Sequence, residues 1–154
     1  MRKNTCKLNP LQPKRDTMDY TIGNKPLPEQ ATDCLVLAVN PQALSATLPA
    51  LTAPQISALI QAGDLGTERF STALLHAPQG LTAKRLLLVN IGSEPLTRSQ
   101  LVKLFEKAAQ HTIQCGAKSA ALALDDIQRQ ADISRVWLVR EAVRTLAAQH
   151  YRFD

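Results

Sequence analysis

The sequence predicts an α/β protein in which helices cover both faces of a mixed β-sheet. Strand-like runs alternate along the chain with segments of helical periodicity, which is the pattern of a sheet layered with helices. The central runs are apolar at every position, as in strands buried on both sides. The 154 residues, 45% apolar and 20% charged, fit one globular domain.

Five segments have the composition of strands. The run Cys34–Val39 is apolar throughout and lies between Asp33 and Asn40. The residues "PQGLTA" separate two further runs and are short enough for a hairpin, which makes those two strands antiparallel neighbours and the sheet mixed. The predicted strands are Met18–Ile22, Cys34–Val39, Phe70–Ala77, Lys84–Ile91 and Lys118–Leu124.

Helices are predicted between these strands. Prolines divide the stretch after the first buried run, which indicates a short turn of helix near Ala43 and a helix over Pro54–Ala62, ended by Gly63. A further helix begins after Thr97 and ends at Gly116. The last helix contains the apolar positions from Ile133 to Ala147, and Asp132 or Ser134 is expected to cap it.

The positive charge is concentrated at the N-terminus. Of the 18 lysines and arginines, five precede Asp16, and the other 13 match the 13 aspartates and glutamates. Residues 1–16 are therefore predicted to form a flexible basic tail, and residues 17–154 a single folded domain. The tail is interpreted either as a flexible segment or as a weak, salt-sensitive phosphate contact.

The sequence also predicts a cytoplasmic protein. No apolar run approaches the roughly 20 residues that cross a membrane, and no apolar segment follows the basic N-terminus as in a secretory signal. The three cysteines, Cys6, Cys34 and Cys115, have neither zinc-site spacing nor an even number for a disulfide framework. Cys34 and Cys115 are expected to be small core residues.

No catalytic or metal-binding residue is predicted. The three histidines are His76, His111 and His150, and none has a partner at the spacing of a metal motif. Asp125 and Asp126 follow a predicted strand, where ligand sites of α/β proteins lie. Two adjacent residues of a strand point in opposite directions, so these carboxylates are interpreted as turn and cap residues in an acidic loop.

The segment "RLLLVNIGSEPLT" has the order strand, glycine, loop and helix start, which is typical of phosphate-binding loops. It has one glycine where a dinucleotide site needs three. Glu94 would repel a phosphate, and Pro95 removes a backbone donor. Thr97 and Gln100 instead fit a capping box for the following helix. The segment is therefore predicted to be a connection and not a nucleotide site.

The segment that runs from "PQISALIQAGDL" through "KRLLLVNIG" to a helix that opens with "LT" resembles the N-terminal domain of the leucyl (cytosol) aminopeptidases, the M17 metallopeptidases. The closing "YRFD" fits the same pattern, and the resemblance covers residues 31 to 154. It implies a macro-domain-like, three-layer α/β fold. It also implies a parent hydrolase of two parts, in which a separate C-terminal protease domain holds two divalent metals, manganese or zinc, and releases N-terminal amino acids from peptides.

The metal-binding "NTDAEGR" stretch of that catalytic domain is absent from this sequence. The resemblance therefore implies no catalytic, metal-binding or cofactor residue here, and no enzymatic activity for this chain alone. It implies a role in hexamer assembly or in access to the active site, with the catalytic domain and neighbouring subunits as partners. A stand-alone macro-type ligand module and a DNA-binding module acting through the tail are the alternatives. Neutral charge in residues 16–154 gives no support to DNA binding by the folded part.

Overall fold

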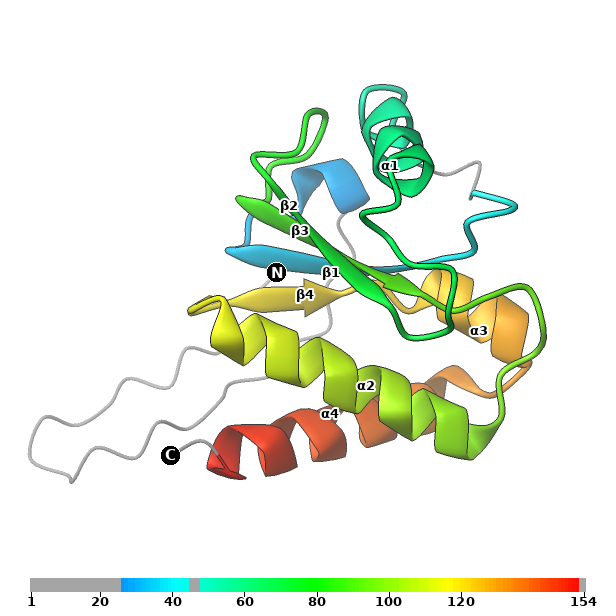
Figure 1. The fold of residues 1–154 in the computed structure, drawn as a ribbon. Coiled ribbons are helices and arrows are strands. Elements are labelled where there is room, and N and C mark those ends of the chain that lie inside the picture. Colours follow the sequence, from blue (N-terminus) through cyan, green and yellow to red (C-terminus); the bar gives the residue numbers. More distant parts are fainter. Residues whose placement is uncertain (1–25, 45–47, 153–154) are drawn as a thin grey trace, which may run out of the picture.

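A mixed sheet lies at the centre of the protein (Figure 1). The computed structural model describes residues 26–44 and 48–152, and within these residues the sheet has four strands in the order β2-β3-β1-β4. The strands are β1 (Cys34–Val39), β2 (Thr72–His76), β3 (Arg85–Asn90) and β4 (Ala120–Leu122). The α/β fold class is confirmed. The predicted strand Met18–Ile22 and the tail lie outside the described residues.

The central strand β1 is parallel to both of its neighbours, β3 and β4. β2 is antiparallel to β3, which confirms the predicted hairpin. β2 is shorter than predicted because Phe70 and Ala77 have positive φ angles of 73° and 50°, so the extended backbone lies between these two residues. All six residues of β1 are buried, as their apolar run predicted.

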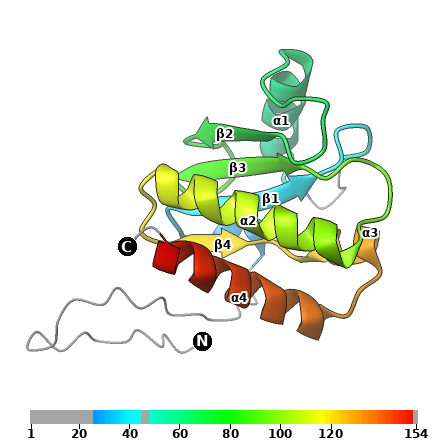
Figure 2. The same ribbon diagram turned by 60° about the horizontal axis from the view of Figure 1, so that its bottom comes forward.

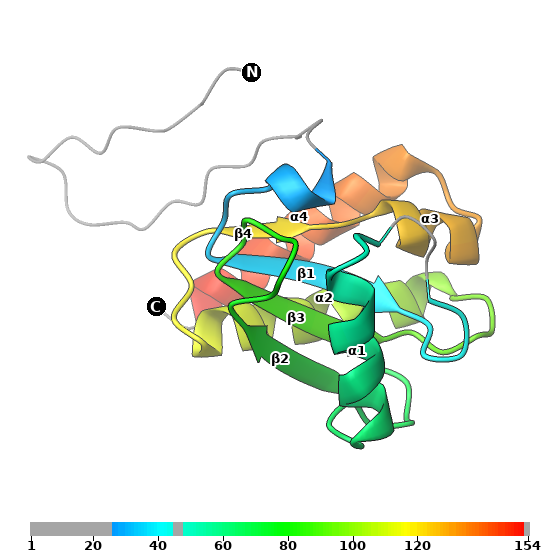
Figure 3. The ribbon, with the colours of Figure 1, turned by 90° about the horizontal axis from the view of Figure 1, so that it is seen from above.

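Helices cover both faces of the sheet and give it three layers (Figures 2 and 3). The helix α1 (Thr52–Gln61) covers one face, where Ile56 belongs to the same buried cluster as Leu35, Leu37 and Leu88. The opposite face carries α2 (Arg98–Gln114), α3 (Asp125–Ala131) and α4 (Arg135–Arg152). Successive strand residues therefore enter different cores, as a strand with two covered faces requires.

The helix ends show which capping signals were correct. At α2, the amide of Gln100 donates to Thr97 Oγ1 at 3.3 Å and the amide of Thr97 donates to Gln100 Oε1 at 2.9 Å, which confirms the capping box. At α4, the amide of Trp137 donates to Ser134 Oγ at 3.3 Å, so Ser134 is the cap. Asp132 has left-handed backbone and ends α3 instead.

Two sequence predictions are wrong in this region of the fold. The residues around Ala43 form a turn, closed by the Ala43 amide on the Asn40 carbonyl, and not a helix. The predicted acidic loop is the first turn of α3, with Leu124 at the capping position and Asp125 and Asp126 inside the helix. A helix of seven residues in which only Ile127 and Ala131 are apolar has too little apolar periodicity to be recognised. No helix in the described part of the chain is long and apolar enough to cross a membrane.

Candidate functional site

The carboxyl ends of the three parallel strands meet at one edge of the sheet, which is where open α/β folds bind ligands. The β3–α2 loop, residues 91–97, begins at this edge. It connects β3 to α2, and the chain then continues to β4 on the far side of β1. This loop lies at the point where the direction of the strand order reverses, so it is the first place to look for a site.

Arg69 reaches this loop from the turn that precedes β2. Its Nε donates to the carbonyl of Ile91 at 2.7 Å, and its Nη2 donates to the carbonyl of Glu94 at 2.6 Å. The guanidinium therefore lies against the inner side of the loop, where two main-chain oxygens face it. Hydrogen bonds from a charged donor are among the stronger ones in proteins.

Gln130 of α3 binds the same loop from another direction. Its Nε2 lies 3.2 Å from the carbonyl oxygen of Ile91, 3.0 Å from that of Gly92 and 2.8 Å from that of Glu94. The loop thus turns three carbonyls inward onto two side chains. A phosphate-binding loop does the reverse, because it turns its amides toward the ligand.

The loop's glycine is explained by Arg69 and not by a ligand. Gly92 has a φ of +68°, which few side chains tolerate, and a Cβ built there would lie 3.2 Å from Arg69 Nε. Its amide donates to Asn90 Oδ1 at 2.8 Å, so this donor is already used inside the loop. The amides of Ile91 and Thr97 are also used within the protein, by the carbonyl of Val39 and by Gln100 Oε1, so the β3–α2 loop is a hydrogen-bonded connection.

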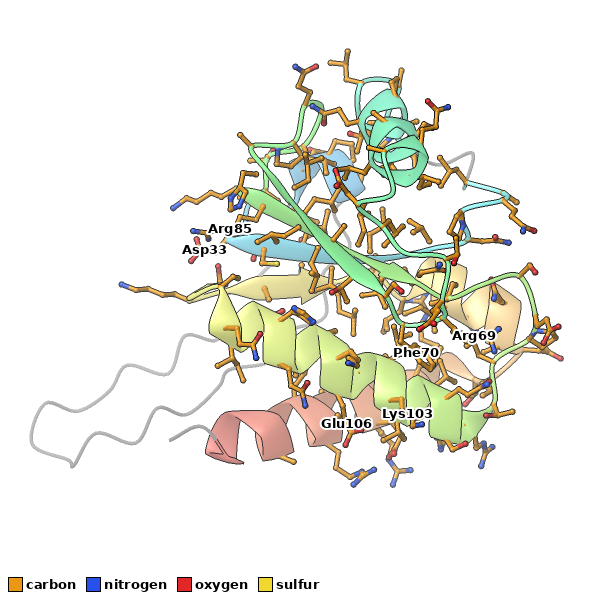
Figure 4. All side chains as sticks on the ribbon, in the orientation of Figure 1. Asp33, Arg69, Phe70, Arg85, Lys103 and Glu106 are labelled. Atoms are coloured by element: carbon orange, nitrogen blue, oxygen red, sulfur yellow. The ribbon has the colours of Figure 1, made fainter. Side chains whose placement is uncertain are left out.

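A shallow groove of about 460 Å³ lies beside the same turn, between Arg69 and α2. Figure 4 shows Arg69 and Phe70 near the part of α2 that carries Lys103 and Glu106, whereas Asp33 and Arg85 lie at the other end of the sheet. The groove carries charges of both signs. Its lining residues are Glu68, Arg69, Phe70, Ser71, Lys103, Glu106, Lys107 and Gln110.

The histidines are not brought together. His76 is exposed at the end of β2, and His111 is half-buried on α2 with its Nε2 3.2 Å from Thr72 Oγ1. His150 lies in α4, and its side chain is outside the described part of the structure. Among the described residues, no group of three His, Cys, Asp or Glu side chains is placed to hold a metal ion.

The imidazole of His111 should make stability depend on pH. Burial, with a smaller effect of the Lys107 charge, lowers the pKa of His111 below its usual value of 6.5. As the pH falls, His111 of the unfolded chain is therefore protonated before His111 of the folded protein. Neutral His111 thus favours the folded state fully above about pH 6.5, and this contribution to the free energy of unfolding decreases at lower pH. We expect the melting temperature of the wild type to fall between pH 7 and pH 5, and the His111→Gln variant to lose part of that dependence.

The matched control is Gln110→Ala, which changes a neighbouring residue that does not titrate and should keep the wild-type pH dependence. Melting curves followed by circular dichroism at half-unit pH steps give the change of melting temperature with pH for the wild type and for each variant. Equal slopes for His111→Gln and the wild type would show that His111 does not contribute.

The cysteine prediction is confirmed for Cys34, which is fully buried in β1. Burial raises the pKa of its thiol to about 11, with a further effect of the nearby Cys115, so the unreactive thiol form predominates at neutral pH. Cys115 follows α2 and is half-buried, with its thiol donating to the carbonyl of Thr112 at 3.2 Å. Cys6 lies outside the described residues.

Arg69 and Gln130 were missed by sequence reasoning. Each is a single polar residue without a motif, and the segments that contain them are joined only by the fold. The positive φ of Phe70 has no sequence signal either, because phenylalanine rarely adopts it. Gly92 was the only sign of this arrangement in the sequence. A glycine in such a loop indicates that another group lies close to the backbone, but it does not identify that group as Arg69.

Residues 36–154 match the family model described as "Cytosol aminopeptidase family, N-terminal domain". The chain belongs to the cytosol aminopeptidase family. Among curated members, the probable cytosol aminopeptidase of Alcanivorax borkumensis is 37% identical over 138 residues, and the cytosol aminopeptidase of Haemophilus influenzae is 32% identical over 142 residues. In both cases the match covers 89% of this chain but only 28% of the relative. The chain thus corresponds to the N-terminal domain of these aminopeptidases.

Solved structures show the fold of this aminopeptidase domain. The macrodomain of Mycobacterium tuberculosis DarG superposes with a TM-score of 0.65 at 13% identity, covering 81% of this chain and 88% of that one. The Oceanobacillus iheyensis macrodomain gives a TM-score of 0.57 at 11% identity, covering 84% of this chain and 73% of the other. The macro-domain-like fold is therefore confirmed, and at these identities the likeness concerns the fold alone.

Proposed function

We propose that this chain serves as the non-catalytic N-terminal domain of a cytoplasmic leucyl aminopeptidase, and that it acts in hexamer assembly or in access to the active site. The observation that carries the proposal is the family match over residues 36–154, together with relatives more than three times as long. In this proposal the absent catalytic domain holds two divalent metals, manganese or zinc, and removes N-terminal residues from peptides. Residues 1–16 are a flexible basic tail, and residues 17–154 form the domain.

The structure supports a binding role better than a chemical one. The charged side chains that do come together line a shallow groove and carry both signs, and the loop at the edge of the sheet where ligand sites form is bridged by Arg69 and Gln130. The same bridging argues against the alternative of a stand-alone macro-type module for ADP-ribose or nucleotides. The alternative of DNA binding through the tail concerns residues outside the described structure, so removal of residues 1–15 followed by a gel-shift assay is its test.

A chimera tests the proposal. This chain replaces the matching N-terminal region of the Alcanivorax borkumensis relative, and a second protein lacks that region altogether. We expect the chimera to retain the relative's oligomeric mass and its hydrolysis of leucyl p-nitroanilide in manganese buffer, and the deletion variant to lose assembly, activity or both. A deletion variant that assembles and hydrolyses like the intact relative would overturn the proposed role.

The chain by itself is the second arm of the experiment. Purified and supplied with manganese or zinc, it should leave leucyl p-nitroanilide uncleaved, whereas the intact relative should cleave it under the same conditions. Turnover by this chain that rises with its concentration and persists through repeated purification would contradict a non-catalytic role.

A further inference from the structure

Strand β2 forms one edge of the sheet, and its outer side has no described neighbour. The strand order β2-β3-β1-β4 places β3 on its inner side, and no described strand pairs with its outer side. The helix α2 covers one face of the sheet here, where His111 meets Thr72 and Leu74 packs against the core, and leaves the outer backbone of β2 unpaired. Among the residues that the structure describes, the backbone of β2 is therefore paired on one side only.

Two hydrogen bonds identify which backbone groups point outward. The amide of Ala77 donates to the carbonyl of Lys84 at 2.9 Å, and the amide of Asn90 donates to the carbonyl of Ser71 at 2.8 Å. In an antiparallel pair, hydrogen-bonded residues alternate with residues whose amide and carbonyl face away. The amides and carbonyls of Thr72, Leu74 and His76 thus point away from β3, and we call them the free edge.

The free edge lacks the devices that usually prevent pairing. Natural edge strands carry prolines, inward charges or bulges within the strand, and β2 has neither a proline nor a lysine in "TALLH". Its limits are set at its ends, by the positive φ angles of Phe70 and Ala77 and by a bulge in which Phe70 and Ser71 both pair with Asn90. The other edge strand, β4, has just three residues, so β2 offers the longer template for another strand.

We propose that the free edge pairs with β2 of a second copy of this chain, antiparallel and centred on Leu74. In this register Leu74 faces Leu74 of the second copy, and Thr72 faces His76 of the second copy. The outward groups then form hydrogen-bonded pairs throughout, because an antiparallel pairing about a two-fold axis is self-complementary. The two sheets become one continuous sheet.

The side chains of β2 favour pairing with β2 of a second copy. Thr72, Leu74 and His76 share the face that carries α2, because Thr72 contacts His111 and side chains alternate along a strand. Leu74 is partly buried against the core under α2 and would gain an apolar neighbour across the new pair. The two leucines at the centre would lose exposure together.

Charge also favours a second copy over a uniformly acidic partner. The groove next to β2 contains Lys103 and Lys107 but also Glu68 and Glu106, and none of them is in an ion pair with another described residue. A second copy brings the same mixture and can match each sign with its opposite. A polyanion would meet the two glutamates as well as the lysines.

The inference deepens the assembly role and rests on that proposed function for its biological meaning. The pairing itself is measured on this chain alone. Failure of the pairing would leave the chimera experiment unaffected, and failure of the chimera would leave the pairing to be measured as before.

Light scattering coupled to size exclusion tests the pairing. We expect the mass of the full chain to rise with concentration from 16.8 kDa toward twice that value. His76→Pro removes an amide that points outward, at a position whose side chain is exposed, so it should leave the β3 ladder intact and keep the chain monomeric. His76→Ala is the matched control, because it removes the same imidazole, keeps the amide and should dimerise as the wild type does.

Amide hydrogen exchange of the wild type gives a second readout that needs no variant. Protection of the Thr72, Leu74 and His76 amides should increase several-fold between dilute and concentrated protein, while Ala73 and Leu75 stay protected at both concentrations. A monomeric mass at every concentration, or dimerisation of His76→Pro equal to that of His76→Ala, would overturn the proposal. Protected edge amides in a monomer would also overturn it, because another part of the chain would then cover the edge.

Discussion

Replacement of Phe105 by alanine should lower the free energy of unfolding by about 3–5 kcal/mol, the range found for large aromatic residues in protein cores. Phe105 lies on α2 with no exposed surface, and it packs in the core between the helices and one face of the sheet. Removing the ring loses its burial and leaves a cavity among side chains of three elements. Urea denaturation followed by circular dichroism measures the change.

The control for this prediction is Val136→Ala on α4. Val136 is 69% exposed, so its truncation should change the free energy of unfolding by less than about 0.5 kcal/mol. If the two variants unfolded at similar urea concentrations, the α2 face of the sheet would not be the core that the structure shows.

Replacement of Asn90 by alanine should lower the free energy of unfolding by about 2–4 kcal/mol, because it removes a buried side chain and leaves two part-buried polar groups without partners at about 1–3 kcal/mol each. Asn90 is 2% exposed at the end of β3. Its Nδ2 donates to the carbonyl of Gly66 at 2.8 Å, and its Oδ1 accepts from the amide of Gly92 at 2.8 Å. The same side chain thus holds the turn before β2 and the start of the β3–α2 loop.

Asn40 provides the matched control. It is also an asparagine at the carboxyl end of a central strand, since it directly follows β1, whereas Asn90 is the last residue of β3. Among the described residues, Oδ1 of Asn40 accepts from the exposed amide of Gln42 at 3.0 Å, so Asn40→Ala should lower the free energy of unfolding by about 1 kcal/mol or less. Thermal and urea unfolding of both variants compare the two asparagines directly. Equal losses at the two positions would mean that the hydrogen bonds of Asn90 do not hold the loop.

The sequence was most informative where one local pattern decides the structure. The run from Cys34 to Val39 is a strand with the predicted ends, because burial on both faces requires apolar residues at every position. The capping box at Thr97 is likewise local, since its two hydrogen bonds join residues three apart. The resemblance to the aminopeptidase N-terminal domain rested on such local segments, and the family match confirms it.

The candidate site could not be predicted in the same way. The fold brings Arg69 and Gln130 to the carbonyls of Ile91 and Glu94, although these residues are separated by 22 to 39 positions in the chain. Sequence reasoning rejected a phosphate site from the single glycine, Glu94 and Pro95. It could not show that a guanidinium fills the inner side of the loop, since no pattern in one segment determines what the other segments bring to it.

The hydrogen bonds that Arg69 and Gln130 make to the β3–α2 loop should suppress local unfolding of this loop. Arg69, Asn90 and Gln130 join segments from three parts of the chain through the same few main-chain atoms. The loop cannot swing outward alone, because its departure breaks contacts to the turn before β2 and to α3 at the same moment. Surface loops are commonly the first parts of a protein to fluctuate. Here the amides of Ile91 and Gly92, which donate to the carbonyl of Val39 and to Asn90 Oδ1, should exchange with solvent only at the rate of whole-domain unfolding, as a single cooperative unit with the sheet.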